Sequence, residues 1–159
     1  MVACLSLFLM AAAEEFLIRG LILSAFLKKY GAQNMIRAVL VSAILFSVMH
    51  LVNLFRMNMA EVFIQMIIAF FFGVFFGALM MKTKNLFYLS IIHGIINICF
   101  SLDAVLRKTS VKKTVDSWQE ILAAIGTTTL ILSPLFIIGF LILRNMKKEE
   151  LRKLAIVNQ

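Results

Sequence analysis

The amino-acid sequence has little of the charge that a soluble domain carries on its surface. Only 15% of the 159 residues are charged and 62% are hydrophobic, whereas typical soluble domains are roughly 25% charged and 45–50% apolar. A compact soluble core of this length cannot hide so much apolar surface. The shortage of charge therefore excludes an ordinary soluble domain and indicates an integral membrane protein.

Proline and cysteine are also scarce, and several kinds of site are absent. One proline and no inverted repeat give little support to a transporter built from broken helices. The two cysteines, Cys4 and Cys99, form no CxxC pair, so we interpret them as buried small hydrophobic residues without a redox role. The sequence contains no Gly-rich phosphate loop, Ser/His/Asp set or cysteine-ligand metal site. No basic region precedes the first apolar run, which argues against a signal peptide.

Long apolar runs make up most of the chain. Each is about 20 residues long, enough to cross a hydrocarbon core of roughly 30 Å. The predicted spans are residues 4–27, 36–55, 61–81, 85–104 and 119–143. The expected fold class is therefore all-α, a polytopic transmembrane helical bundle with about five spans. Residues 1–145 would form the membrane domain, and residues 146–159 a basic cytoplasmic tail with a short helix at the membrane surface.

Lysine and arginine fall unevenly on the two sides of such a bundle. The richer side holds Lys28, Lys29, Arg37, Lys82, Lys84, Arg144, Lys147, Lys148, Arg152 and Lys153. The other side holds Arg56, Arg107, Lys108, Lys112 and Lys113. The positive-inside rule makes the richer side cytoplasmic, with the C-terminus inside and the N-terminus outside. An outside N-terminus without a leader suggests that further spans precede Met1 or that Met1 is not the natural start.

The net charge of +8 then faces anionic lipid head groups. No basic patch is interleaved with aromatic residues, so nucleic acid is not expected as a partner. The bilayer itself is the partner that this charge predicts.

A few polar side chains interrupt the spans, where a central charge costs at least about 2.5–3.5 kcal/mol. They are Glu14, Glu15, Arg19, His50, Gln65, His93 and Asn97. Counted from the richer basic side, the two glutamates, His50 and Asn97 all lie thirteen or fourteen residues deep, roughly 20 Å along their helices. His93 lies one turn nearer to that side. A common depth on three helices predicts one shared intramembrane site.

Helical spacing suggests a role for each of these residues. Residues four apart share a helix face, so Glu15 can pair with Arg19, and Glu14 then points about 100° away toward another partner. Two further pairs share a face by the same rule: Phe46 with His50, and His93 with Asn97. A carboxylate and two imidazoles at one depth can hold and deprotonate water, and an amide adds a donor for an oxyanion. This combination suits hydrolysis of an amide bond inside the membrane.

Each element also has a structural interpretation. An ion pair can simply neutralise itself, a lone histidine can be a hydrogen-bonded packing residue, and a histidine with an asparagine can join two helices. Glu14 has no neutralising partner on its own helix, which favours a function for it. The "GVFFG" stretch, Gly73 to Gly77, is a GxxxG pattern that predicts close packing of the third span against a neighbour.

Three short motifs resemble those of a known family. "EEFLIR" is similar to its EExxxR motif, "FSVMH" to its FxxxH motif and "HGIIN" to its HxxxN motif, in the same order and on separate predicted spans. The family is the CAAX-protease and bacteriocin-processing family, known as CPBP or Abi. The resemblance covers residues 14–97.

The resemblance implies an intramembrane endopeptidase related to the enzymes that trim prenylated CAAX proteins. Glu14 would activate water with help from Glu15. Water positioning and oxyanion stabilisation would fall to the other motif residues: His50, His93 and Asn97.

The resemblance leaves the cofactor open. The family is often described as metalloproteases, and a metal-free glutamate mechanism has also been argued for it. Glu14, His50 and His93 could bind Zn²⁺ with one open position, although the chain has no HExxH helix, so Zn²⁺ and no metal both stay open. Arg19 and Phe46 would support the site structurally.

Many bacterial members act in bacteriocin self-immunity or in peptide processing. The resemblance therefore implies a multi-pass protein of a bacterial cell membrane whose partner is a peptide or protein substrate. Two other functions stay open. The chain could be a non-enzymatic immunity or interaction protein that retains the protease fold, or a small transporter or channel subunit with Glu14 and the histidines as a proton relay.

Overall fold

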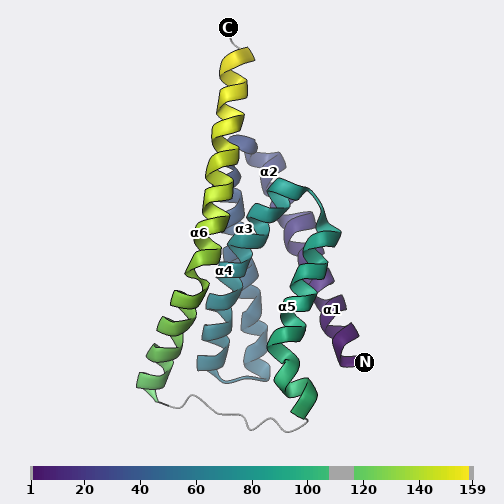
Figure 1. The fold of residues 1–159 in the computed structure, drawn as a ribbon, viewed down its shortest axis with the longest axis vertical. Coiled ribbons are helices and arrows are strands. Elements are labelled where there is room, and N and C mark those ends of the chain that lie inside the picture. The colour runs from purple at the N-terminus through teal and green to yellow at the C-terminus, as the bar shows by residue number, and fades with distance from the viewer. Residues whose placement is uncertain (1, 108–116, 158–159) are drawn as a thin grey trace.

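The computed structural model describes residues 2–107 and 117–157, and every regular element within these ranges is helical. The elements form an elongated bundle (Figure 1). Among the described residues, three helical stretches are long and apolar enough to cross a membrane: Met35–Phe55, Met59–Thr83 and Trp118–Glu149. A shorter apolar stretch covers Leu86–Ser101. The predicted all-α, multi-span fold is confirmed.

The first predicted span is a continuous helical run whose pitch changes in the middle. α1, Val2–Glu15, passes directly into the π-helix η1, Phe16–Leu23, and then into α2, Ser24–Tyr30. A π-helix bonds residues five apart instead of four, so it turns the later residues onto a different face. The hydroxyl of Ser24, the first residue after this wider segment, donates to the carbonyl of Arg19 over 3.1 Å. Nothing in the apolar pattern of the sequence predicts the change of pitch.

The second and third predicted spans form a helical hairpin. α3, Met35–Met49, continues into the 3₁₀ segment η3, His50–Phe55, and α4 covers Met59–Thr83. The side chain of Asn58 accepts a hydrogen bond from the backbone N–H of Glu61 over 2.8 Å and so caps the start of α4. The second span therefore loses its α-helical geometry at His50, which the sequence does not predict.

The last two elements are α5, Leu86–Arg107, and α6, Trp118–Val157. α6 continues without interruption from the last predicted span into the tail, which is helical as predicted. The helix is continuous because residues 143–157 contain neither glycine nor proline and consist largely of good helix formers. The position of the tail at the membrane surface stays a prediction. Lys108, Lys112 and Lys113 of the predicted outer loop, and the last two residues of the tail, lie outside the described residues.

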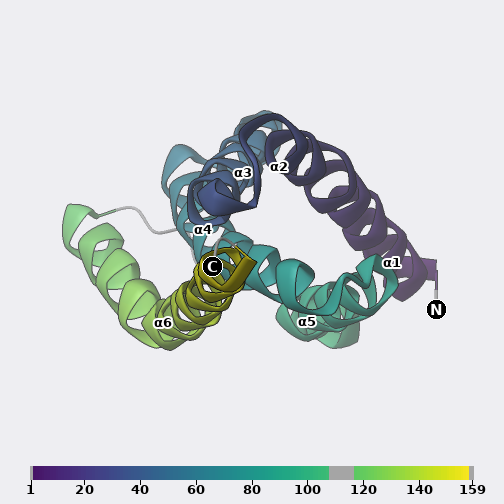
Figure 2. The same ribbon diagram turned by 90° about the horizontal axis from the view of Figure 1, so that it is seen from above.

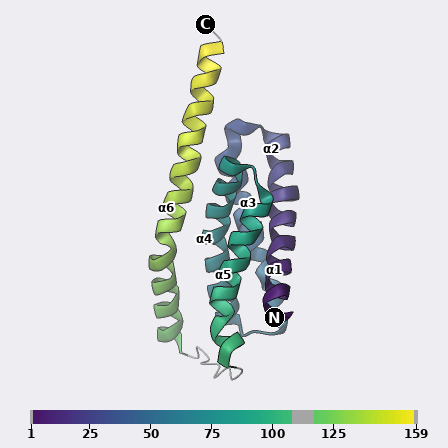
Figure 3. The same cartoon turned by 45° about the vertical axis from the view of Figure 1, so that its right-hand side comes forward.

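The helices pack as two groups joined by the π-helix. α1 packs along α5, whereas α4 contacts both α3 and α6. Seen from above, the two groups lie on either side of the bundle (Figure 2). η1 contacts α3, α4 and α5, so it touches both groups. α6 and α1 lie on opposite sides of the bundle (Figures 1 and 3).

Successive helices run in alternating directions, as a multi-pass protein requires. The last turns of α2 and α4 carry Lys28, Lys29 and Lys82, and both turns lie at the end of the bundle from which α6 extends (Figure 1). The structure thus gathers these basic residues at one end. The side of the membrane that this end faces stays a prediction.

Two glycines set the distance between α3 and α4. A Cβ added to Gly73 would lie 2.9 Å from the Cβ and 3.0 Å from the Cα of Ala43, and one added to Gly77 would lie 2.7 Å from Cγ1 of Val39. At Gly73 the contact is with the backbone of α3, so a larger residue there requires a helix to move, whereas at Gly77 the contact is with the Val39 side chain. The close packing predicted from the GxxxG pattern is confirmed, with α3 as the neighbour.

The cysteines lie nearer the surface than the sequence suggests. Cys4 is partly exposed and Cys99 is exposed, so the prediction that both are buried is wrong. In a membrane bundle a small apolar side chain need not be buried in protein, because lipid is equally apolar.

Candidate active site

A cavity of about 670 Å³ is lined by α1, the end of α3, η3, α4 and α5. Four of the predicted catalytic residues line it: Glu14, His50, His93 and Asn97. Much of the remaining lining is apolar and includes Leu7, Met10, Ile64, Ile68, Phe72 and Phe100. Polar side chains from α1, η3 and α5 therefore meet in one largely apolar cavity.

Beside the cavity, Glu15 and Arg19 form a fully buried ion pair. Both side chains are 0% exposed, and Nη1 of Arg19 donates to Oε1 of Glu15 over 3.0 Å. Nη2 of Arg19 also donates to the carbonyl of Gly73 over 3.2 Å, and the guanidinium lies 4.7 Å from the centroid of the Phe46 ring. Buried charges need a partner and hydrogen bonds to persist. The pair that the spacing predicts is present, and its arginine connects η1 to α4.

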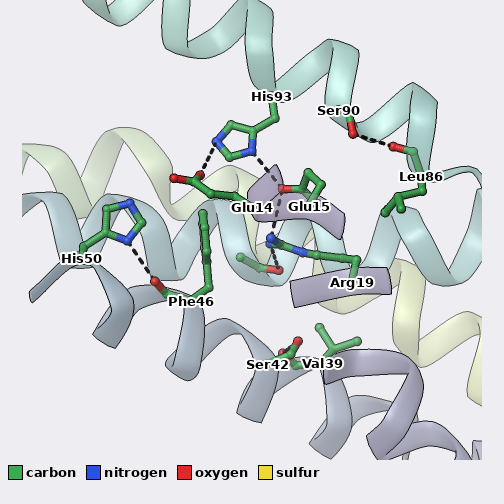
Figure 4. Close-up of polar contacts among 11 residues, drawn as sticks. Glu14, Glu15, Arg19, Val39, Ser42, Phe46, His50, Leu86, Ser90 and His93 are labelled. Atoms are coloured by element: carbon green, nitrogen blue, oxygen red, sulfur yellow. Dashed lines mark hydrogen bonds and ion pairs between the residues drawn. The ribbon is translucent and has the colours of Figure 1, made fainter. Parts of the chain in front are cut away.

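His93 lies between the two glutamates (Figure 4). Its Nδ1 is 2.9 Å from Oε1 of Glu15, and its Nε2 is 3.7 Å from Oε2 of Glu14. A carboxylate can only accept, so Nδ1 of His93 carries the proton and donates to Glu15. The longer distance to Glu14 exceeds a direct hydrogen bond. Oε1 of Glu15 therefore receives donors from both His93 and Arg19, a contact between α1 and α5 that the sequence does not predict.

His50 is held by its own helix through Phe46. Its Nδ1 lies 2.9 Å from the Phe46 carbonyl, which can only accept, so Nδ1 carries the proton and Nε2 remains as an acceptor. The Phe46 ring is 2% exposed and lies edge-on to both imidazoles, with centroids 5.0 Å from His50 and 5.9 Å from His93. Phe46 thus fixes both the tautomer of His50 and the spacing of the two histidines.

The described side chains do not fit a metal centre. In residues 2–107 and 117–157, no group of three or more His, Cys, Asp or Glu side chains is placed to hold a metal ion. This covers Glu14, His50 and His93, the set that the sequence leaves open for Zn²⁺. His93 directs Nδ1 toward Glu15 and Nε2 toward Glu14, so both of its ring nitrogens face carboxylates.

Comparison with known proteins identifies the family. A family model described as "Type II CAAX prenyl endopeptidase Rce1-like" matches residues 1–99 of the 159-residue chain. The chain belongs to this family. Comparisons of this Rce1-like chain with curated proteins and with solved structures gave no match. Membership of the Rce1-like family implies a protease, and the apolar helices indicate a multi-pass membrane protein.

Four polar residues line the cavity of this Rce1-like chain without being predicted as site residues from the sequence: Asn53, Glu61, Gln65 and Ser101. Asn53 in η3 and Gln65 in α4 both line the cavity, and Nδ2 of Asn53 donates to Oε1 of Gln65 over 2.7 Å. Gln65 is visible in the sequence only as an isolated polar residue of the third span. Asn53 follows His50 by three residues within an apolar stretch, a signal that could have indicated it.

Proposed function

We propose that this Rce1-like chain is an intramembrane endopeptidase in which Glu14 activates water. The observation that supports this most is that Glu14, two histidines and an asparagine from three different elements line one largely apolar cavity. Of the two motif carboxylates, Glu14 is 24% exposed and Glu15 is fully buried. Glu14 is therefore the carboxylate of this motif that water can reach.

The proposed reaction is hydrolysis of a peptide bond. Glu14 removes a proton from water while the water oxygen attacks the carbonyl carbon. Nε2 of His50 accepts a hydrogen bond from the other O–H group of the same water. The amide of Asn97 donates to the oxyanion that forms. Glu14 then passes its proton to the peptide nitrogen as the C–N bond breaks, so that one peptide and one water give a carboxylic acid and an amine.

Glu15 has a positioning role in this proposal. Its Oε1 accepts hydrogen bonds from His93 and Arg19 at the same time, which orients the imidazole so that Nε2 lies beside Glu14. Full burial keeps Glu15 away from water. Phe46 positions His50 in the same manner, through the carbonyl that accepts from Nδ1.

The proposed substrate is a membrane-associated peptide of the prenylated or leader type. The largely apolar lining of the cavity suits such a peptide, and the family description names CAAX prenyl endopeptidases. We place the protein in a bacterial cell membrane, in bacteriocin self-immunity or peptide processing. Its basic end and C-terminus would face the cytoplasm, where anionic head groups attract lysine and arginine.

A comparison of wild-type protein with Glu14→Gln tests the proposal before the natural substrate is known. Membranes from cells that express each form would be analysed by mass spectrometry for peptide N-termini. We expect a set of N-termini that only the wild type produces, because a glutamine cannot accept the proton of water. Glu120→Gln, the same substitution at an exposed residue at the start of α6, should give the wild-type set.

The same experiment separates the enzyme from a non-enzymatic interaction protein. Identical N-termini from wild-type and Glu14→Gln membranes, at equal expression, would contradict an endopeptidase in which Glu14 activates water. An interaction protein that uses the polar residues only for packing would instead lose function in proportion to the abundance of each variant.

A further inference from the structure

The cavity contains a second polar pair that the proposed mechanism does not use. Asn53 and Gln65 lie opposite one another on η3 and α4 and are joined by a hydrogen bond of 2.7 Å. Neither belongs to the three sequence motifs. Both line the same largely apolar cavity as Glu14 and His50, where an amide that lacks a partner is unfavourable.

The single bond between these amides leaves part of their hydrogen-bonding capacity unused. Each amide has one oxygen acceptor and an NH₂ group with two donors. Among the described residues, Oδ1 of Asn53 and the NH₂ group of Gln65 have no partner. Exchanging oxygen and nitrogen in both amides would reverse the bond and still leave one acceptor and one donor. The pair therefore offers one acceptor oxygen and one NH₂ donor group to whatever occupies the cavity.

The geometry of η3 places this pair at a defined distance from the site. η3 begins at His50, and a 3₁₀-helix has about three residues per turn with a rise of about 2.0 Å per residue. Asn53 therefore lies on the same face as His50 and roughly 6 Å farther along the axis. An extended peptide advances about 3.3 Å per residue, so this distance corresponds to about two residues of peptide.

A peptide that is cleaved inside a membrane must expose backbone groups that bulk water does not reach. Each extended residue then presents one N–H and one C=O that need partners in the protein. We propose that Asn53 and Gln65 together bind the backbone of the substrate residue that lies about two positions from the cleaved bond. This inference rests on the proposed endopeptidase function. It makes recognition at that position depend on the backbone and little on the side chain.

The test removes both amides at once. In Asn53→Leu/Gln65→Met, apolar side chains of similar shape replace both partners, a change that can be nearly neutral for stability. The matched control is Gln33→Met, which makes the same substitution at an exposed residue that does not line the cavity. The probe is a prenylated CAAX peptide with a fluorophore and a quencher on either side of the cleaved bond. Ester versions of the probe replace single backbone N–H groups by oxygen.

The readout is the ratio of kcat/KM for the amide probe to that for each ester probe. In the wild type and in Gln33→Met, we expect the ester two positions from the cleaved bond to lower kcat/KM by about 2- to 10-fold, the effect of one lost hydrogen bond. In the double variant, we expect the amide and ester probes to be cleaved equally. A ratio that is the same in the wild type and the double variant would overturn the inference, even if the double variant unfolds at a lower temperature.

A binding measurement keeps this test separate from that of the proposed function. In a Glu14→Gln background, fluorescence anisotropy of the labelled amide probe in proteoliposomes measures binding without cleavage. We expect the double substitution to weaken binding several-fold, and unchanged binding would contradict the role of the pair. If neither the wild type nor Glu14→Gln cleaves the probe, the endopeptidase proposal fails, and the binding comparison still decides the role of the pair.

Discussion

Replacing Gly73 by alanine should disable the site through packing alone. The added Cβ would lie 2.9 Å from the Cβ and 3.0 Å from the Cα of Ala43, whereas carbon atoms pack comfortably at about 3.5–4.0 Å. The Cα of Ala43 belongs to the backbone of α3, so no side-chain rotation relieves the contact. α3 and α4 must therefore move apart by roughly 0.5–1 Å.

That movement acts on the site at two points. The carbonyl of Gly73 accepts from Arg19 over 3.2 Å, which is already at the upper end of the usual range. α3 carries Phe46 and leads into His50, so its displacement moves this histidine relative to Glu14. Overpacking costs about 1–3 kcal/mol, offset by up to about 1 kcal/mol from the higher helix propensity of alanine. A misplacement of about 1 Å can lower the rate roughly 100-fold.

Two other glycines provide matched controls for Gly73→Ala. A Cβ on Gly139 would lie 3.1 Å from the Cα of Phe75, a comparable backbone contact between α6 and α4. A Cβ on Gly126 would meet nothing within 4 Å. Thermal unfolding in detergent and cleavage of the prenylated probe would be measured for all three alanine variants. We expect wild-type Tm and cleavage for Gly126→Ala, and a lower Tm with retained cleavage for Gly139→Ala. For Gly73→Ala we expect a lower Tm together with loss of cleavage.

Two results would refute this reasoning. Wild-type cleavage by Gly73→Ala, at the stability of Gly126→Ala, would show that α3 and α4 accommodate the methyl group without moving the site. Equal losses of cleavage in Gly73→Ala and Gly139→Ala would show that activity follows stability and not the position of the catalytic groups.

Two further predictions concern the ion pair and the metal. Arg19→Met leaves the fully buried Glu15 without its counter-ion, so we expect the free energy of unfolding in detergent to fall by about 3–5 kcal/mol. Adding Glu15→Gln should recover part of this loss. No recovery would contradict the pairing. Because no described group of His, Cys, Asp or Glu side chains is placed to hold a metal ion, a chelator should leave the cleavage rate unchanged. If the chelator abolishes cleavage and only added Zn²⁺ restores it, the site rearranges around a metal.

Short-range spacing allowed part of this structure to be predicted from the sequence. The i,i+4 rule places Glu15 beside Arg19 on one turn, and the structure contains that pair. Apolar runs of membrane length predict the multi-span helical bundle. The GxxxG pattern predicts a close helix contact, which Gly73 makes with Ala43. Each of these predictions depends on residues that are near one another in the chain or on the composition of one segment.

The features that escaped prediction depend on contacts between distant segments. The bond from His93 to Glu15 joins residues 78 apart in sequence, and no local pattern specifies it. The π-helix Phe16–Leu23 and the 3₁₀ segment His50–Phe55 have apolar compositions that fit an α-helix equally well. The bond from Asn53 to Gln65 joins two different elements, and no pattern within one segment specifies it.

The rate of peptide cleavage by Glu14→Gln tests the central claim most directly. Purified wild-type and variant proteins would be compared in proteoliposomes with the prenylated fluorogenic probe, and their unfolding temperatures would be measured in parallel. General-base catalysis contributes about 10²- to 10⁴-fold, so we predict a loss of that size at an unchanged Tm. Cleavage by Glu14→Gln at the wild-type rate would contradict the role of Glu14 as the base.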